Sequence, residues 1–143
     1  ITDLTRDDVA EAIEDAFRYS KLIIAASSYD GGVFPPMEDF LNRLSHKAYQ
    51  NRTVGLVENG SWAPCAARAM KGFVENMKNI TICDNTVTIK STLKDADMDS
   101  VSALVDEILN TLNKKETCIK LKSCAKSPFC TVYIYYTTRF LPL

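Results

Sequence analysis

Residues 53–64 read Thr53-Val54-Gly55-Leu56-Val57-Glu58-Asn59-Gly60-Ser61-Trp62-Ala63-Pro64, and this stretch decides the fold of the chain. The apolar run 53–57 predicts a strand that is buried on both faces, as in a parallel sheet. A polar loop that carries one tryptophan follows it. Proline is well suited to the first turn of a helix, where its missing N–H is not needed, so a helix is expected after Pro64. The stretch therefore predicts a strand, a loop and a helix in direct succession.

A second junction of the same kind lies upstream. The apolar run 22–26 leads into the polar loop 27–32 and then into Phe34-Pro35-Pro36-Met37. In an open parallel α/β sheet, ligands bind outside the carboxyl ends of the strands. Each of the two loops carries one aromatic residue among small polar ones, Tyr29 in the first and Trp62 in the second. This arrangement favours a flat aromatic ligand that lies edge-on in a cleft.

The remaining elements alternate in the same way. Apolar residues at helical spacing predict four helices, which begin near Thr5 as a capping residue, at Pro35, after Pro64 and at Asp95 or Asp97. Strands are expected at 21–26 and 53–57, and two short ones at 79–83 and 86–89 around a turn at Asp84-Asn85. Alternating helices and strands imply βαβ crossovers, so the expected fold class is α/β, a three-layer sandwich with a parallel sheet.

The same residues resemble a known family. Residues 28–41, with Gly31-Gly32-Val33-Phe34-Pro35-Pro36-Met37, resemble the second flavin loop in the flavodoxin-like domain of flavodiiron proteins, or A-type flavoproteins. Residues 51–64 resemble the next strand and the third flavin loop, and 88–95 resemble the last strand and the start of the last helix. The resemblance extends over 1–112. It implies noncovalent FMN that passes electrons to a diiron site in another domain, where oxygen or nitric oxide is reduced.

The resemblance also implies which residues contact the flavin. They are Ser27, Ser28, Tyr29, Asp30, Gly31, Gly32, Asn59, Gly60, Ser61 and Trp62. Trp62 would stack on the ring, although a surface tryptophan packed on the next helix is the alternative. Asp30 stands where most relatives have asparagine. Its carboxylate would make reduction of the flavin harder, unless it is only a solvated turn residue.

Part of the family pattern is missing from this chain. Flavodoxin-like domains open with a strand and a phosphate-binding loop, but no glycine precedes Gly31 here. The chain is therefore N-terminally truncated relative to the family, and the incomplete domain is expected to hold FMN weakly or not at all. In the strand order 2-1-3-4-5, the missing first strand would lie beside 21–26, so its loss exposes an edge of the sheet.

Residues 113–143 show no resemblance to the family, and their role is unknown. Within them, 131–138 reads as a β segment. It is weakly similar to the opening strand of flavodoxins but lacks the Gly-Asn-Thr that would follow it. The expectation is a loosely attached tail, and the alternative is that this segment adds a strand in the missing place.

Composition excludes several other classes. The 143 residues carry a net charge of −1 and no basic stripe, which argues against nucleic-acid binding. No apolar run is long enough to cross a membrane, and the polar N-terminus favours the cytoplasm. The single histidine and the spacing of the five cysteines do not suggest a metal site. No catalytic constellation is found, so any chemistry would belong to a cofactor.

Three functions remain open. The first is an FMN-binding electron-transfer domain of a flavodiiron-type oxygen or nitric oxide reductase, with a redox partner protein or a diiron domain as its partner and a homodimer left open. The second is a flavin-free flavodoxin-fold remnant that acts as a binding or structural module. The third is a flavodoxin-fold quinone or FMN reductase, against which the loop 59–64 argues.

Overall fold

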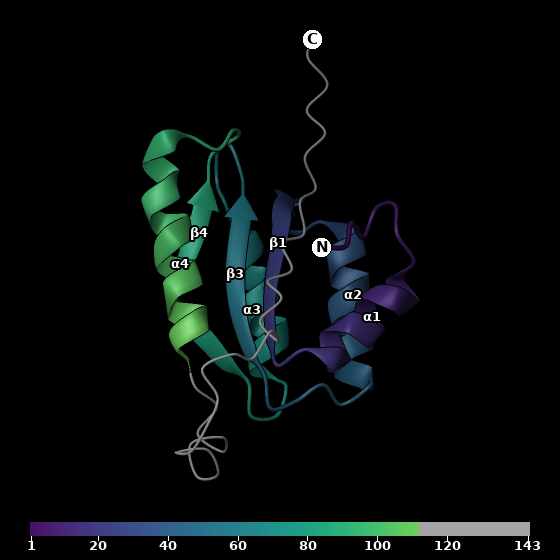
Figure 1. Ribbon diagram of the computed structural model, residues 1–143. Coiled ribbons are helices and arrows are strands. Elements are labelled where there is room, and N and C mark those ends of the chain that lie inside the picture. The colour runs from purple at the N-terminus through teal and green to yellow at the C-terminus, as the bar shows by residue number, and fades with distance from the viewer. Residues whose placement is uncertain (112–143) are drawn as a thin grey trace, which may run out of the picture.

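The computed structural model describes residues 1–111 (Figure 1). The predictions for 113–143, including the strand at 131–138, lie outside this range. Within it the elements follow in the order α1 (Val9–Arg18), β1 (Lys21–Tyr29), β2 (Gly32–Val33), α2 (Pro35–His46), β3 (Thr53–Asn59), α3 (Ala66–Glu75), β4 (Thr81–Ile89), the short 3₁₀ helix η1 (Asp95–Asp97) and α4 (Met98–Asn110).

The strands form one sheet in the order β2-β1-β3-β4. β1, β3 and β4 run parallel, as predicted, whereas β2 is a two-residue strand that pairs antiparallel with the end of β1. The register sets Ser27 opposite Asn59, and Asn59 opposite Ile89. The three parallel strands therefore end at the same level, and the loops that follow them leave one edge of the sheet together.

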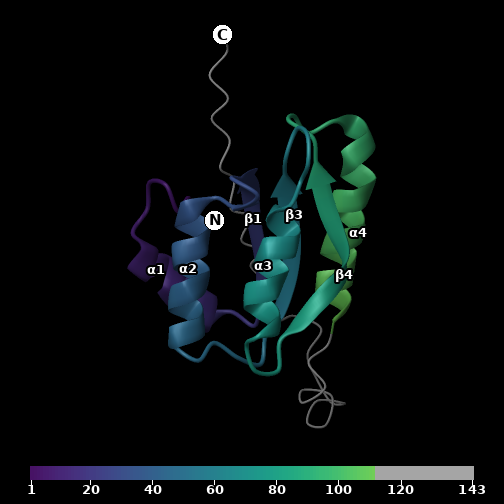
Figure 2. The ribbon, with the colours of Figure 1, turned by 180° about the vertical axis from the view of Figure 1, so that it is seen from behind.

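Helices cover both faces of the sheet, which makes the molecule a three-layer α/β sandwich. α2 and α3 lie on one side of the sheet (Figure 2), and with α1 they form one core against β1 and β3. Phe40 and Met70 are fully buried in this core. α4 packs on the opposite face against Ile23, Val87 and other apolar residues. Gly55 leaves room for this packing, because a methyl group at its Cα would lie 3.1 Å from a side-chain carbon of Leu104.

The first helix starts later than predicted. α1 begins at Val9, and Asp8 caps it, since the Asp8 carboxylate accepts a 2.8 Å hydrogen bond from the N–H of Ala10. The prediction that Thr5 is the cap is therefore wrong. Both residues are good capping types, and periodicity alone does not separate two candidates three positions apart.

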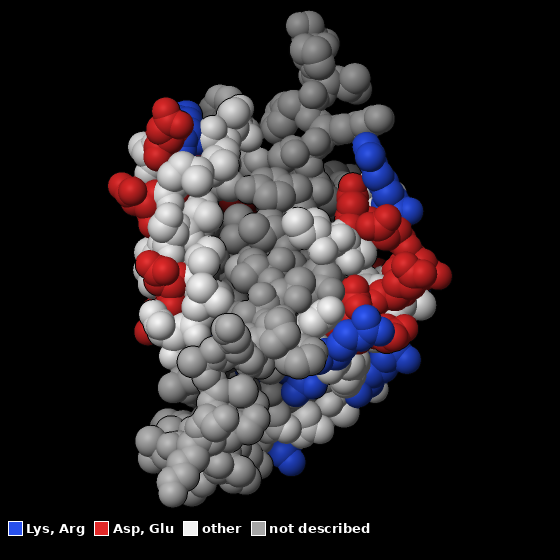
Figure 3. Space-filling view, viewed as in Figure 1, with Lys and Arg blue, Asp and Glu red and all other residues white. Residues whose placement is uncertain are grey.

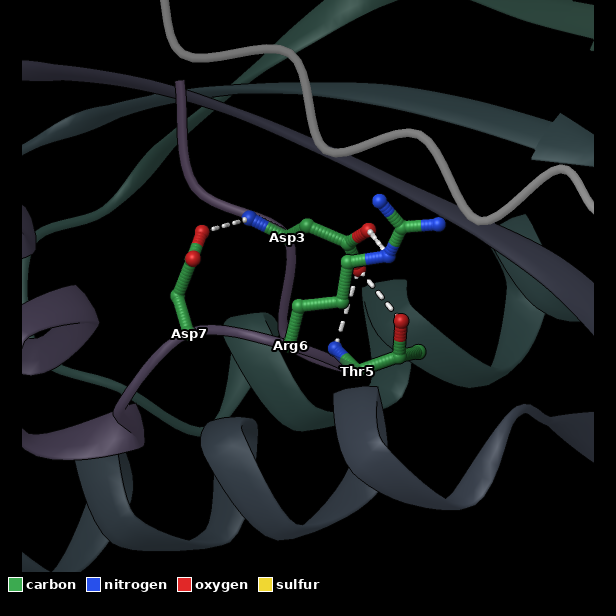
Figure 4. Close-up of polar contacts among 4 residues, drawn as sticks. All are labelled: Asp3, Thr5, Arg6 and Asp7. Carbon is green, nitrogen blue, oxygen red and sulfur yellow. Dashed lines mark hydrogen bonds and ion pairs between the residues drawn. The ribbon is translucent and has the colours of Figure 1, made fainter.

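Thr5 is engaged in a separate turn that precedes the helix (Figure 4). The carboxylate of Asp3 accepts hydrogen bonds from the N–H and the hydroxyl of Thr5, at 3.0 and 2.7 Å, and lies 3.6 Å from Arg6. The side chain of Asp7 accepts the N–H of Asp3. The bonds from Thr5, with the charge of Arg6, hold the pKa of Asp3 below its usual value.

β4 is one strand where two were predicted. Its pairing with β3 shifts between Val54 and Leu56, so that the strand bulges around Asp84 and Asn85. The carboxylate of Glu107 on α4 accepts the backbone N–H groups of both bulge residues, at 2.6 and 2.9 Å. The predicted turn is thus a bulge, because a side chain from another element satisfies the N–H groups that the ladder leaves unpaired.

Candidate functional site

An open cleft of about 480 Å³ lies at the carboxyl edge of the sheet. This volume falls within the roughly 300–1,000 Å³ that is usual for small-molecule sites. The cleft is bounded by the loop after β1 and by the loop and first turn of α3 that follow β3. Its lining consists of Ser28, Tyr29, Asp30, Gly31, Gly60, Ser61, Trp62, Ala63, Cys65 and Arg68.

A tight hairpin forms the first wall of the cleft. Tyr29 pairs with Gly32, and the two residues between them both have positive φ, 46° for Asp30 and 74° for Gly31. A two-residue hairpin of type I′ requires this backbone, and Asp-Gly is one of the pairs that adopt it readily. The turn places the Asp30 carboxylate at the rim of the cleft.

Ser28 joins the two walls. Its hydroxyl oxygen accepts the N–H of Cys65 at 2.8 Å and the N–H of Ala66 at 3.1 Å. Ser28 therefore caps the N-terminus of α3 from the end of strand β1, 37 residues before Cys65. Gly60 sits against the same hydroxyl, since a methyl group at its Cα would lie 3.0 Å from that oxygen and 2.8 Å from the backbone of Pro64.

Glu58 secures the third N–H of this helix end. Its side chain is buried, and one carboxylate oxygen accepts the N–H of Ala67 at 2.8 Å. The other oxygen accepts the hydroxyl of Thr88 on β4 at 2.9 Å. The N–H groups of Cys65, Ala66 and Ala67 are thus all bonded within the protein, and this helix end offers none of them to a phosphate.

The two aromatic residues of the cleft are accessible. Trp62 is 98% exposed, so it does not pack on the following helix. Tyr29 is 56% exposed and meets Phe34 edge to face, with ring centroids 6.1 Å apart. Two large exposed aromatic side chains beside one cleft leave flat apolar surface available to a ligand.

Asn59 serves the loop after β4. Its side-chain amide donates to the carbonyl of Ser91 at 3.0 Å and accepts the N–H of Ser91 at 3.1 Å. Ser91 has a φ of 69° and its hydroxyl lies 2.9 Å from that of Ser61. Asn59 therefore stabilises a strained backbone position next to the cleft.

Seven of the ten residues predicted to bind the cofactor line the cleft together. They are Ser28, Tyr29, Asp30, Gly31, Gly60, Ser61 and Trp62. Ser27, Gly32 and Asn59 lie outside the lining, and the carbonyls of Ser27 and Gly32 accept hydrogen bonds from the backbone of Phe34 and the thiol of Cys65.

Sequence reasoning missed Ala63, Cys65 and Arg68, which also line the cleft. The sequence could have indicated Cys65 and Arg68. Pro64 marks the start of a helix directly after a loop at the carboxyl edge of the sheet, and the first turn of such a helix lies at the same edge.

Other kinds of site find little support in residues 1–111. No three His, Cys, Asp or Glu side chains of this part are grouped to hold a metal ion, and none of its helices is long and apolar enough to cross a membrane. On the face seen in Figure 3, acidic side chains lie along both margins, over α1 and over α4. In the part of that face formed by the described residues, the Lys and Arg side chains form no surface as extensive as the acidic margins.

The sequence matches no known protein family, and no curated protein matches it. Solved structures do match. A rubredoxin oxygen:oxidoreductase from the anaerobe Desulfovibrio gigas superposes with a TM-score of 0.63 over 78% of this chain and 33% of its own, at 14% identity. A flavodoxin from the domain Archaea superposes with a TM-score of 0.59 over 74% of this chain and 72% of its own, at 15% identity.

These likenesses establish the fold. The chain has a flavodoxin-like α/β fold, which confirms the predicted fold class. It spans a third of the length of the oxidoreductase, and at these identities the comparison carries architecture alone.

Proposed function

We propose that this chain is an FMN-binding electron-transfer domain of a flavodiiron-type oxygen or nitric oxide reductase. The observation that carries the proposal is the meeting of Tyr29 and Trp62, which stand 33 positions apart, at one cleft on the carboxyl edge of a flavodoxin-like sheet. Ligands of open α/β sheets bind at this edge. The cleft therefore has the place and the aromatic surface that a flavin ring requires.

The ring of a flavin fits the residues present. Tyr29 and Trp62 offer aromatic faces that would cover the ring and exclude water. Ser28, Gly60 and Ser61 supply hydroxyl and backbone groups for its polar edge. Asp30 would place a negative charge near it. When bound, a flavin would supply the transfer of one or two electrons.

The phosphate of FMN fits less well. Flavodoxin-like folds hold a phosphate with backbone N–H groups at a helix N-terminus. In α3 the donors of Cys65, Ala66 and Ala67 are already bonded to Ser28 and Glu58. In α2 the first two residues, Pro35 and Pro36, have no N–H to give. We therefore expect weak FMN binding by the chain alone.

The partner follows from the same proposal. Under this proposal, electrons that enter the flavin leave to another protein or domain. In residues 1–111 no three His, Cys, Asp or Glu side chains are grouped to hold a metal ion. A diiron domain or a soluble redox protein is the partner that suits this role. We propose that the exposed ring of Trp62 lies on the side where such a partner approaches.

Titration with flavin tests the proposal. Trp62 is the one tryptophan of the chain, so its emission reports on the cleft. Addition of FMN should quench this emission and the fluorescence of the flavin in a saturable manner. Trp62→Phe, which keeps an aromatic ring, should retain binding, and Trp62→Ala should weaken it. The absence of saturable quenching of flavin fluorescence by the wild-type protein would refute the proposal.

A second candidate is a flavin-free module that keeps the fold for binding or structure. The N-termini of α2 and α3 favour this function. Pro35 and Pro36 of α2 have no N–H, and the N–H groups of Cys65 and Ala67 at the start of α3 are bonded within the protein, so none of them is available to a phosphate. The same titration separates the two candidates, because this second function predicts that neither FMN nor riboflavin binds.

A further inference from the structure

Arg68 differs from the other arginines of the described chain. Residues 1–111 contain five arginines, and four of them bond to groups of the fold. Arg6 lies 3.6 Å from Asp3, Arg18 lies 2.7 Å from Glu14, Arg43 lies 2.8 Å from Asp39, and Arg52 donates to the carbonyls of Phe17, Gln50 and Asn51. Within this part of the chain, no ion pair or side-chain hydrogen bond is formed by the guanidinium of Arg68.

The position of Arg68 is also unfavourable for the helix that carries it. It is the third residue of α3, and the first turn of α3 holds no acidic side chain. The N-terminus of a helix bears partial positive charge, so a cation there is destabilising. Arg43, by contrast, lies in the last turn of α2, where a cation is favoured. The fold therefore gains nothing evident from a cation at position 68.

Arg68 lines the cleft together with Tyr29 and Trp62. Within residues 1–111, no carboxylate forms an ion pair with it. Both carboxylate oxygens of Glu58 are engaged, by Ala67 and Thr88, and Asp30 forms no ion pair within residues 1–111. A guanidinium presents several N–H donors in a planar fork that matches a phosphate. Arg68 is thus a donor in the lining that the fold leaves free for an anion.

We propose that Arg68 binds the phosphate monoester of the flavin ligand and selects FMN over riboflavin. The inference rests on the proposed function and adds to it a phosphate contact made by a side chain. A single contact from Arg68 stands in for the several backbone N–H groups that usually hold a phosphate. FMN therefore binds weakly, but still more tightly than riboflavin. Because Arg68 is exposed, the attraction is screened by salt.

The test uses the full 143-residue chain, its Arg68→Gln variant and Arg43→Gln as the matched control, each titrated with oxidised FMN and oxidised riboflavin. The wild-type protein should prefer FMN by about tenfold at low salt, as one charge-assisted hydrogen-bonded contact implies. The preference should shrink at high salt. Arg68→Gln should bind FMN and riboflavin with the affinity that the wild-type protein has for riboflavin. Arg43→Gln should keep the full preference for FMN.

A second readout needs no ligand. Arg68→Gln should raise the melting temperature by about 1–5 °C, because it removes a cation from the start of a helix. Arg43→Gln should not raise it, since it removes an ion pair and a favourable charge. A lower melting temperature in Arg68→Gln, with both flavins bound less tightly, would make Arg68 a structural residue and overturn the proposal.

The binding outcomes distinguish this proposal from the one on which it rests. A wild-type protein that binds FMN and riboflavin equally, or an Arg68→Gln variant that still prefers FMN, overturns the phosphate subsite and leaves the flavin cleft standing. A wild-type protein that binds neither flavin overturns the proposed function, and the subsite with it.

Discussion

Substitution of Ser28 by alanine tests whether the two walls of the cleft are held together as the structure shows. The Ser28 hydroxyl accepts two backbone N–H groups of the next wall, from Cys65 at 2.8 Å and from Ala66 at 3.1 Å. Alanine removes the oxygen and little else. Both donors at the start of α3 would then lose their partner at a site that is half-buried.

The size of the effect follows from these contacts. Loss of a helix cap costs about 0.5–2 kcal/mol, and Ser28 serves as the cap although it belongs to strand β1. The second N–H adds to this, but water reaches a half-buried site and replaces part of the bond. We expect the free energy of unfolding to fall by about 1–2 kcal/mol. This corresponds to a drop of roughly 3–8 °C in melting temperature for a domain of this size.

Urea denaturation followed by circular dichroism measures this change, and Ser61→Ala is its control. Ser61 lines the same cleft, but its exposed hydroxyl bonds only the hydroxyl of Ser91 among the described contacts. Ser61→Ala should therefore stay within about 0.5 kcal/mol of wild type. A Ser28→Ala protein that is no less stable than Ser61→Ala would show that α3 does not depend on this cap.

The remaining predictions concern the cleft, the core and the bulge. Trp62→Ala should leave the free energy of unfolding within about 0.5 kcal/mol of wild type, because the side chain is 98% exposed. It should weaken FMN binding about twofold to tenfold. An unchanged affinity in a fluorescence titration would place Trp62 outside the site. Asp30→Asn should keep the hairpin, since Asn-Gly suits the same turn, and should raise the midpoint potential of bound flavin by removing a negative charge; a potentiometric titration that gives the same or a lower value would contradict this. Gly55→Ala should cost about 1–3 kcal/mol, because the added methyl meets Leu104 at 3.1 Å, and a urea midpoint equal to that of wild type would refute it. Partial burial raises the pKa of Glu107, but the hydrogen bonds from the bulge outweigh this effect and hold the pKa below its usual value. The ionised carboxylate therefore stabilises the fold at neutral pH, and this stability is lost as the pH falls through the lowered pKa. Melting curves at acid pH in which Glu107→Gln shows the same loss of stability as wild type would show another group to be responsible.

The boundaries of the elements show where local reasoning stops. The strands predicted at 21–26 and 53–57 extend in the structure to Tyr29 and Asn59. The added residues are polar, so no local pattern marks them as strand. Ser27 and Asn59 are strand residues because they face each other in register, and pairing between distant segments is not encoded in the periodicity of either.

The bulge in β4 has a similar cause. Asp84-Asn85 is a turn by composition, and the prediction of two strands around it follows from propensity. The carboxylate of Glu107, on a helix more than twenty residues later, accepts the N–H groups of both residues and lets the strand continue. Only the packing of α4 against β4 brings that side chain there.

The sequence by itself determined the parallel α/β character of the fold, the order of its main helices and strands, and that the loops after the strands would meet at one edge of the sheet. Apolar periodicity and prolines at helix starts act over a few residues, so they can be read without knowledge of the rest of the chain. The tertiary structure alone decided what individual polar side chains do. Ser28 caps a helix, Asn59 binds the loop after β4, and Arg68 enters the lining of the cleft. The roles of Ser28 and Asn59 depend on groups from separate strand ends meeting within about 3 Å, the reach of a hydrogen bond, and the register of the sheet sets that distance.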